Sequence, residues 1–260
     1  MLLHLNKKYF IASLLMLGFI LPTSVLAREL PDRNQWQFKL KPLYIWFVNF
    51  DGTSSLPSSD GDGSGNSRPG INYDEAKITG AFSFHFEVEK NNITVFTDYL
   101  YSEWTSNNVT LGNFAGSGKN KLSEHIAELG FAYRIFEHEY FEAEVLAGIR
   151  YLYVGNKFEY NAANIDLSIN RSSHTNIWDG FAGVRLTGYI LDNLSASVRA
   201  DVGGGTSDLV WNIDTLVDWR YIDWGSVYAG YRVLDYKVSS KNIDLNLQGT
   251  GPVMGFAFYW

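Results

Sequence analysis

The chain has 260 residues, with 21 Lys+Arg against 28 Asp+Glu, a formal net charge of -7 and no Cys. Aromatic residues make up 16% of the chain, more than a disordered protein carries. The acidic balance argues against nucleic acid as a partner, because nucleic-acid-binding domains are usually basic. The lack of Cys excludes disulfides, thiolate metal sites and cysteine nucleophiles.

Residues 1–27 have the features of a secretory signal peptide. Two lysines precede an apolar run over 11–21, and small residues at 25 and 27 favour cleavage after Ala27. The run is shorter than the roughly 20 apolar residues that a membrane-spanning helix needs. We therefore expect secretion, signal-peptide cleavage and a single mature domain over 28–260.

Apolar and polar residues alternate through most of the mature chain, which predicts β-strands. The segment 209–221 is the clearest, because Trp211, Val217 and Tyr221 share an apolar face opposite Asp214 and Asp218. At about 3.3 Å per residue and a tilt of about 40°, this segment covers roughly 25 Å, the height of the apolar band of an outer-membrane barrel. Aromatic residues at both of its ends match the interfacial belts of membrane proteins.

Four other segments repeat the pattern, and we expect their apolar faces to point to lipid. The predicted outward residues are Trp36, Phe38, Leu40, Tyr44 and Trp46 in 36–48; Ile78, Gly80, Phe82, Phe84, Phe86 and Val88 in 78–88; Leu129, Phe131, Tyr133 and Ile135 in 123–135; and Phe141, Ala143, Val145, Ala147, Ile149, Tyr151 and Tyr153 in 141–153.

Short and long connections alternate along the chain, which is typical of outer-membrane barrels with short periplasmic turns and long outer loops. Short turns are predicted at 90–92, 137–139, 192–193 and 222–225, and long loops at 51–73, 107–120, 155–174 and 239–248; the outer connection at 203–208 is unusually short. We predict ten strands, and one misread hairpin would change the count to eight or twelve. The predicted strands are at about 34–50, 73–89, 92–106, 121–136, 140–154, 175–191, 194–207, 209–221, 226–238 and 249–260.

The chain ends on an alternating apolar strand with an aromatic last residue, Trp260. This ending resembles the insertion signal of bacterial outer-membrane barrels, which implies the barrel assembly machinery as a partner during biogenesis. Four segments of 176–260 are distinctive: Trp178–Arg185, Ala200–Gly205, Ala229–Arg232 and Gly251–Gly255. They resemble the opacity-like or porin-family group of proteobacterial outer-membrane barrels, a group whose usual terminal residue is Phe. The resemblance implies an all-β transmembrane antiparallel up-and-down barrel in a Gram-negative outer membrane, and no catalytic residues transfer with it.

The face opposite the apolar one is heavily charged, and unpaired charges are costly inside a narrow barrel. We therefore expect cross-strand ion pairs and a filled or very narrow polar lumen. Removing Arg150, Arg185 and Arg220 together should then open a leak. The predicted inward acids are Glu87, Asp98, Glu124, Glu128, Glu142, Glu144, Asp179, Asp201, Asp214 and Asp218, and the predicted inward bases are Lys39, Lys41, Arg134, Arg150, Arg185, Arg199, Arg220 and Arg232.

The histidines give little sign of catalysis. His85 faces the lumen near Glu87, His125 faces outward near the outer rim, and His138 falls in a periplasmic turn. His174 lies beside Ser172 and Ser173 at an outer loop edge, but no Gly-x-Ser-x-Gly elbow is present.

Residues 60–66 match the first half of a calcium-binding loop, but Ile71 stands where the last acidic ligand would be. We therefore predict no catalytic residue, no cofactor and no metal site.

The favoured interpretation is a monomeric, non-enzymatic integral outer-membrane barrel that contacts lipid and lipopolysaccharide. The first alternative is a narrow polar channel for small solutes or ions. Further alternatives are an enzyme acting at the outer rim on lipid A or peptides, and an adhesin that uses the Ser-, Gly- and Asn-rich loops.

Overall fold

The computed structural model describes residues 33–46, 49–55, 77–106, 116–162, 168–240 and 243–260. The predicted signal peptide over 1–27 and the calcium-like segment over 60–66 lie outside these residues. All regular secondary structure in the described ranges is β-strand. No helix of these ranges is long and apolar enough to cross a membrane.

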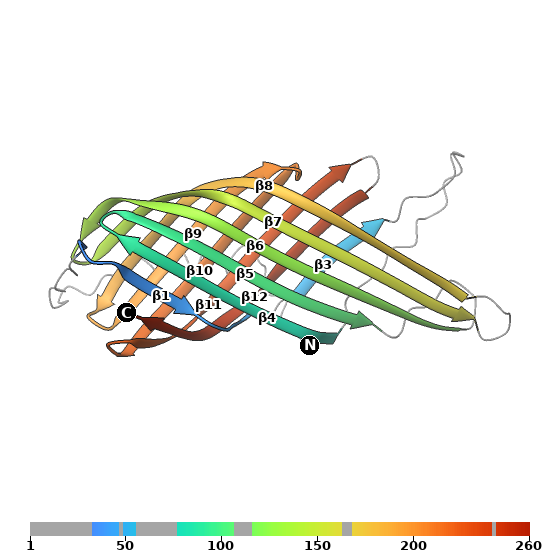
Figure 1. The fold of residues 1–260 in the computed structure, drawn as a ribbon, viewed down its shortest axis with the longest axis horizontal. Helices are drawn as coiled ribbons and strands as arrows, with labels where there is room; N and C mark the ends of the chain where they lie inside the picture. The colour runs from blue at the N-terminus through green and yellow to red at the C-terminus, as the bar shows by residue number, and fades with distance from the viewer. Residues whose placement is uncertain (1–32, 47–48, 56–76, 107–115, 163–167, 241–242) are drawn as a thin grey trace, which may run out of the picture.

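The strands pair antiparallel in chain order and the sheet closes on itself (Figure 1). The first strand is broken into β1 (Gln37–Lys41), β2 (Tyr44–Trp46) and β3 (Asn49–Ser55), which all pair with the last strand. Nine unbroken strands follow, so the prediction of a ten-stranded antiparallel up-and-down barrel is confirmed. They are β4 (Lys77–Lys90), β5 (Ile93–Ser106), β6 (Gly116–His138), β7 (Phe141–Ala162), β8 (Ser168–Leu191), β9 (Leu194–Gly205), β10 (Leu209–Ile222), β11 (Gly225–Ser240) and β12 (Ile243–Tyr259).

The break in the first strand reverses which side chains face the lumen. Lys39 pairs with Tyr259 but Tyr44 pairs with Gly255, so five residue steps on one strand oppose four on the other. This extra residue acts as a β-bulge, and a shift of one residue turns every following side chain to the opposite face. Tyr44 and Trp46 are therefore buried in the lumen, and the prediction that they face lipid is wrong.

Two local features stabilise this break. Pro42 lies inside it and has no backbone N–H to leave unpaired. The hydroxyl of Ser83 on β4 accepts a hydrogen bond from the Tyr44 N–H at 3.1 Å and donates one to the Tyr44 carbonyl. A side chain therefore satisfies backbone groups of β2 at a position where the ladder between β1 and β4 has ended.

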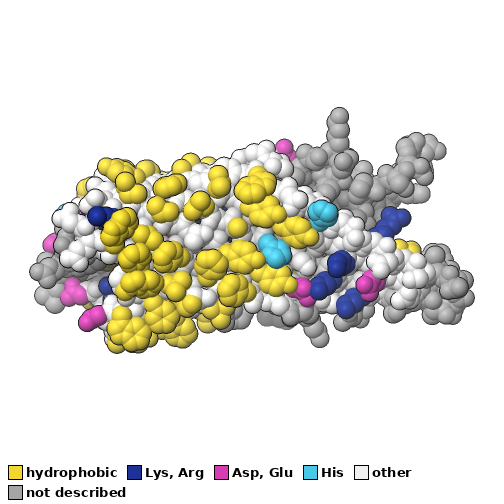
Figure 2. Space-filling model, in the orientation of Figure 1, with side chains coloured by type: hydrophobic (Ala, Val, Ile, Leu, Met, Phe, Trp, Pro, Cys, Tyr) yellow, Lys and Arg dark blue, Asp and Glu magenta, His cyan; other side chains and the backbone are white. Residues whose placement is uncertain are grey.

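The outward face carries the apolar band that the alternation predicts. Val217, Ile149 and Phe256 are 48%, 51% and 58% exposed, as residues in contact with lipid would be. Figure 2 shows apolar side chains covering much of the visible face, with charged side chains and histidines gathered toward the end opposite the tight turns. Aromatic residues lie outward at both edges of the band: Trp36, Tyr221, Trp224 and Trp260 at one, and Tyr99, Tyr101, Tyr151, Tyr153 and Trp178 toward the other.

We call the two ends of the barrel the turn end, where the tight turns lie, and the loop end. Strands β6, β7 and β8 have 23, 22 and 24 residues and extend past their neighbours at the loop end (Figure 1). The loops predicted at 107–120 and 155–174 are thus partly strand, because β6 begins at Gly116 and β7 pairs with β8 as far as Asn161. The loops predicted at 51–73 and 239–248 also overlap strands, because β3 reaches Ser55, β11 reaches Ser240 and β12 begins at Ile243. The prediction failed there because strands beyond the membrane need no apolar face.

The last strand closes the barrel. Phe258 pairs with both Gly225 and Leu40, and the Trp260 ring stacks on Phe38 with centroids 5.5 Å apart. Deleting 258–260 removes these closing contacts together with the aromatic end of the chain. We expect the truncated chain to be lost from the outer membrane, measured as membrane-integrated protein after fractionation. Equal amounts of truncated and intact protein would contradict this.

The two faces of β10 should respond differently to substitution. Val217→Arg places a charge on the lipid face between the aromatic belts and should lower the free energy of unfolding by about 2–4 kcal/mol. Asp218→Asn, one residue away but inward, keeps a side-chain acceptor for Ser226 and Tyr259 and should cost less. Urea unfolding in lipid vesicles gives both values, and a larger loss for Asp218→Asn would show that the facing is wrong.

Candidate functional site

The inward side chains at mid-height form a buried layer of ion pairs. Arg150 on β7 donates from Nε to Glu128 on β6 and from Nη2 to Asp201 on β9, both at 2.8 Å. These three residues are between 1% and 5% exposed. β9 is separated from β7 by β8, so the Arg150 side chain ties strands that do not pair with each other.

Glu128 is the centre of this layer. Besides Arg150, it contacts Arg199 at 2.8 Å and Arg232 at 3.3 Å, and Arg232 reaches Asp98 on β5 at 3.6 Å. Three guanidinium groups thus surround one carboxylate, with further acids around them. We call Glu128, Arg150, Arg199, Asp201 and Arg232 the arginine layer.

Two phenylalanines fill the space between these ion pairs. Arg150 lies over the ring of Phe181 at 4.8 Å, and Arg199 lies over Phe96 at 5.0 Å. A Cβ atom on Gly130 would lie 2.3 Å from Phe96 Cζ, and one on Gly148 would lie 2.7 Å from Phe181 Cζ. Glycine at these two inward positions therefore makes room for the rings on which the arginines stack.

The lumen between the arginine layer and the loop end is apolar, which the sequence analysis did not anticipate. Leu152, Ile177 and Val210 have 0% exposure, and the rings of this region pack in the same cluster. A polar lumen along the whole barrel was expected, but polar residues such as Glu124 are here embedded among apolar ones. We call this region the apolar plug: Trp46, Leu100, Trp104, Leu122, Ile126, Leu152, Ile177, Val210, Leu234 and Tyr236.

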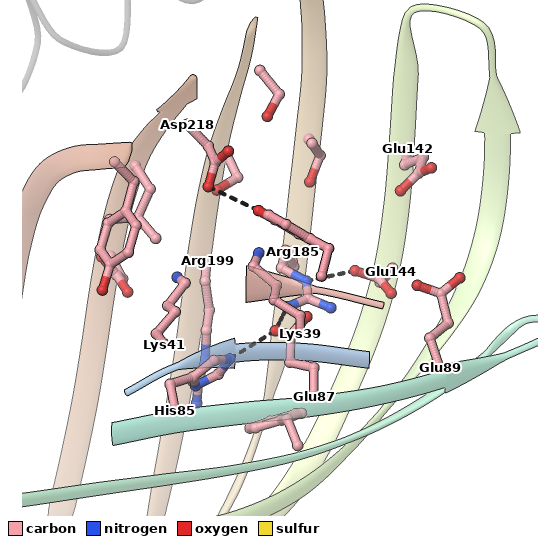
Figure 3. Close-up of a pocket in the computed structure, with 18 of the residues that line it drawn as sticks. Lys39, Lys41, His85, Glu87, Glu89, Glu142, Glu144, Arg185, Arg199 and Asp218 are labelled. Atoms are coloured by element: carbon pink, nitrogen blue, oxygen red, sulfur yellow. Dashed lines mark hydrogen bonds and ion pairs between the residues drawn. The ribbon is translucent and has the colours of Figure 1, made fainter. Parts of the chain in front are cut away.

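The lumen between the arginine layer and the turn end contains a cavity of about 260 Å³ (Figure 3). Arg185 contacts Glu87 and Glu144 at 2.5 Å each, and His85 contacts Glu87 at 2.8 Å and Asp98 at 3.2 Å. Both ring nitrogens of His85 are therefore engaged by carboxylates.

A second ion-pair cluster lies at the rim of this cavity. Arg33, which precedes β1, contacts Glu89 and Glu137 at 2.7 Å and Glu142 at 2.5 Å. Burial disfavours its charge, but the three carboxylates outweigh burial and raise the pKa of Arg33 above its usual value. Alternation in the sequence does not reveal Arg33 and Glu137, because Arg33 precedes the first strand and Glu137 follows the predicted strand 121–136.

The structure places the acids and bases predicted to face the lumen on inward positions, where most of them are buried. His125 faces outward as predicted and contacts Tyr99, Tyr101 and Tyr153. His174 is not at a loop edge but within β8, where it is exposed and stacks on Tyr153.

His138 is the last residue of β6 rather than part of the turn. Among the residues that the structure describes, no group of three His, Asp or Glu is arranged to hold a metal ion.

Comparison with known proteins gives matches to solved structures alone. No protein-family profile matches the chain, and no curated protein matches its sequence. The outer membrane protease OmpT from Escherichia coli matches with a TM-score of 0.47 at 8% identity, over 90% of this chain and 100% of that one. Ail, the attachment invasion locus protein of Yersinia pestis, matches with a TM-score of 0.36 at 14% identity, over 87% and 99%. The KdgM porin matches with a TM-score of 0.25 at 8% identity, over 68% of this chain and 98% of that one.

The chain is a transmembrane antiparallel β-barrel. Its closed antiparallel sheet and outward apolar band carry that conclusion. The solved structures are outer-membrane proteins of different kinds, and their identities and TM-scores are too low to transfer an activity. The finer resemblance to the opacity-like group finds no match in these comparisons.

The arginine layer generates a stability prediction. Arg150→Met removes the guanidinium between Glu128 and Asp201 and leaves buried carboxylates undercompensated, so we expect a loss of about 3–5 kcal/mol. Arg220→Met is the matched control, because Arg220 is exposed at the turn end and should cost under about 1 kcal/mol. Urea unfolding of both variants in vesicles measures the difference. Equal losses would mean that the buried ion pairs do not stabilise the barrel.

Proposed function

We propose that this protein is a non-conducting, non-enzymatic integral barrel of the outer membrane. The proposal rests on one observation: the arginine layer and the apolar plug are two buried regions that follow one another along the lumen. The barrel then serves as an anchor that holds the extended loop-end strands β6, β7 and β8 outside the membrane. With the short turns on the periplasmic side, as in other outer-membrane barrels, the cavity opens to the periplasm.

The apolar plug argues against the channel alternative. A selective pore needs a continuous polar path in which protein groups replace the hydration shell of the solute. Leu152, Ile177 and Val210 have no exposed surface, so water does not reach these three side chains. An ion crossing this region would lose much of its hydration and meet few polar groups, Glu124 and Asn120 among them.

The histidines argue against the enzyme alternative. A general base needs a free nitrogen within reach of a substrate proton. Both nitrogens of His85 already contact carboxylates, and His174 lies exposed on the outward face without an ion pair to any described residue. Neither histidine therefore combines an orienting acid with an accessible nitrogen.

The expected leak from removing three arginines needs revision. Arg150 lies in the arginine layer, Arg185 pairs with acids in the cavity, and Arg220 stacks on Tyr259 at 4.1 Å near the rim. Because these side chains lie at three depths, removing them leaves the apolar plug in place. A leak requires changes in both regions.

Single-channel recording in planar bilayers tests the proposal. The wild type should show no steady conductance, and neither should the variant with Arg150, Arg185 and Arg220 changed to Ala. Adding Trp46→Gly and Trp104→Gly to Arg150→Ala removes bulk from the plug and the layer together and should produce a leak. A large steady conductance in the wild type would instead establish the channel alternative.

A further inference from the structure

We propose that the turn-end cavity is a binding site for one phosphate group, either free phosphate or the phosphate of a small periplasmic solute. The site is formed by Lys39 and Lys41 of β1 and Arg220 of β10, with the hydroxyl of Tyr228 as a further donor. All four residues line the cavity.

These three cations differ from the other cations of the cavity in having no carboxylate partner among the described residues. Each of the other cavity-lining arginines has a carboxylate within 4.0 Å: Arg33, Arg134, Arg185, Arg199 and Arg232. Lys39, Lys41 and Arg220 have no ion pair with any residue in the described part of the chain. Their contacts there are with tyrosine rings.

Two tyrosine rings on neighbouring strands contact the three cations. Lys39 Nζ lies 5.7 Å and Arg220 Cζ lies 4.1 Å from the centroid of the Tyr259 ring. Lys41 Nζ lies 4.4 Å from the ring of Tyr228, on the strand next to that of Tyr259. Figure 3 shows Lys39 and Lys41 directed into the cavity from β1.

Two buried polar groups beside the cavity lack partners among the described residues. Lys41 is only 7% exposed, so its ammonium group has left bulk water without gaining a carboxylate among the described residues. The hydroxyl of Tyr228 is buried and has no hydrogen-bond partner there. An oxyanion in the cavity would supply an acceptor to both groups.

The acids nearest to these cations are partly engaged by other groups. Glu87, which lies near Lys39, pairs with Arg185 at 2.5 Å and with His85 at 2.8 Å. Asp218 already accepts hydrogen bonds from Ser226 and Tyr259, at 3.0 and 3.1 Å. Asp214 has a buried carboxylate oxygen without a partner in the described chain, so it is the group that weakens the binding of an anion.

Small side chains that line the cavity on β8 and β9, namely Thr187, Ser195 and Ser197, leave space for a ligand. Gly255 makes room for the Tyr228 hydroxyl, which would lie 2.5 Å from a Cβ atom there. The volume of about 260 Å³ is just under the roughly 300 Å³ at which pockets for drug-sized ligands begin, so the ligand is small. Four donors suit the four oxygens of phosphate better than the two of a carboxylate.

Titration calorimetry on the full refolded mature protein in detergent tests the site, with inorganic phosphate as the probe. The wild type should bind phosphate saturably with one site per chain. Lys41→Met and Arg220→Gln should each weaken binding about tenfold, because each removes a charge-assisted hydrogen bond. Asp214→Asn should strengthen binding, since it removes a neighbouring negative charge. Lys121→Met, on the outward face, is the control and should change nothing.

Glycerol 1-phosphate separates the two sources of the group. Tighter binding than that of inorganic phosphate would identify a phosphate ester as the ligand, and weaker binding would identify free phosphate.

Arg220 is exposed at the rim, so Arg220→Gln keeps the test valid if Lys41→Met fails to fold. Absence of saturable wild-type binding, or equal binding in wild type, Arg220→Gln and Lys121→Met, would overturn the site. The phosphate site rests on the proposed function only in that the cavity opens to the periplasm. A barrel that conducts ions and also binds phosphate here would contradict the proposed function but not the site.

Discussion

The contact of Glu128 with three guanidinium groups is the interaction on which the rest of the lumen depends. A carboxylate surrounded by a closed sheet has no bulk water to solvate it, so it must be paired or left uncharged. Arg150, Arg199 and Arg232 supply that pairing from three different strands. Since each arginine also contacts Asp201 or Asp98, the layer fixes the positions of five strands around the lumen.

The arginine layer divides the lumen into two regions of opposite character. Toward the loop end the inward positions are mostly apolar and buried, with Glu124 and Asn120 embedded among them. Toward the turn end the inward positions are charged and surround a cavity. A barrel of ten strands is only slightly wider than one of eight, whose interior side chains fill it, so this division is possible without a separate plug domain.

Alternation in the sequence predicts most of the fold because a strand must show one face to lipid and the other to the lumen. It fails where it is interrupted: the extra residue at Pro42 turns Tyr44 and Trp46 inward, and no property of those two residues reveals this. It also does not identify apolar residues on the inward face. Leu152 is two residues after Arg150 and therefore faces the lumen, but the sequence does not show that it packs with other apolar residues there. Contacts across the lumen, such as Arg150 with Asp201, depend on closure and are invisible in any single segment.

The boundary between cavity and plug is the central claim, and the lack of native Cys allows it to be measured directly. Single cysteines at Ser197, which lines the cavity, and at Ser102, which is buried on the plug side, would be treated with a small charged thiol reagent in vesicles. The account predicts rapid modification of Ser197→Cys by reagent reaching the turn end and none of Ser102→Cys from either end. Modification of both cysteines at similar rates would show a continuous aqueous path and contradict the account.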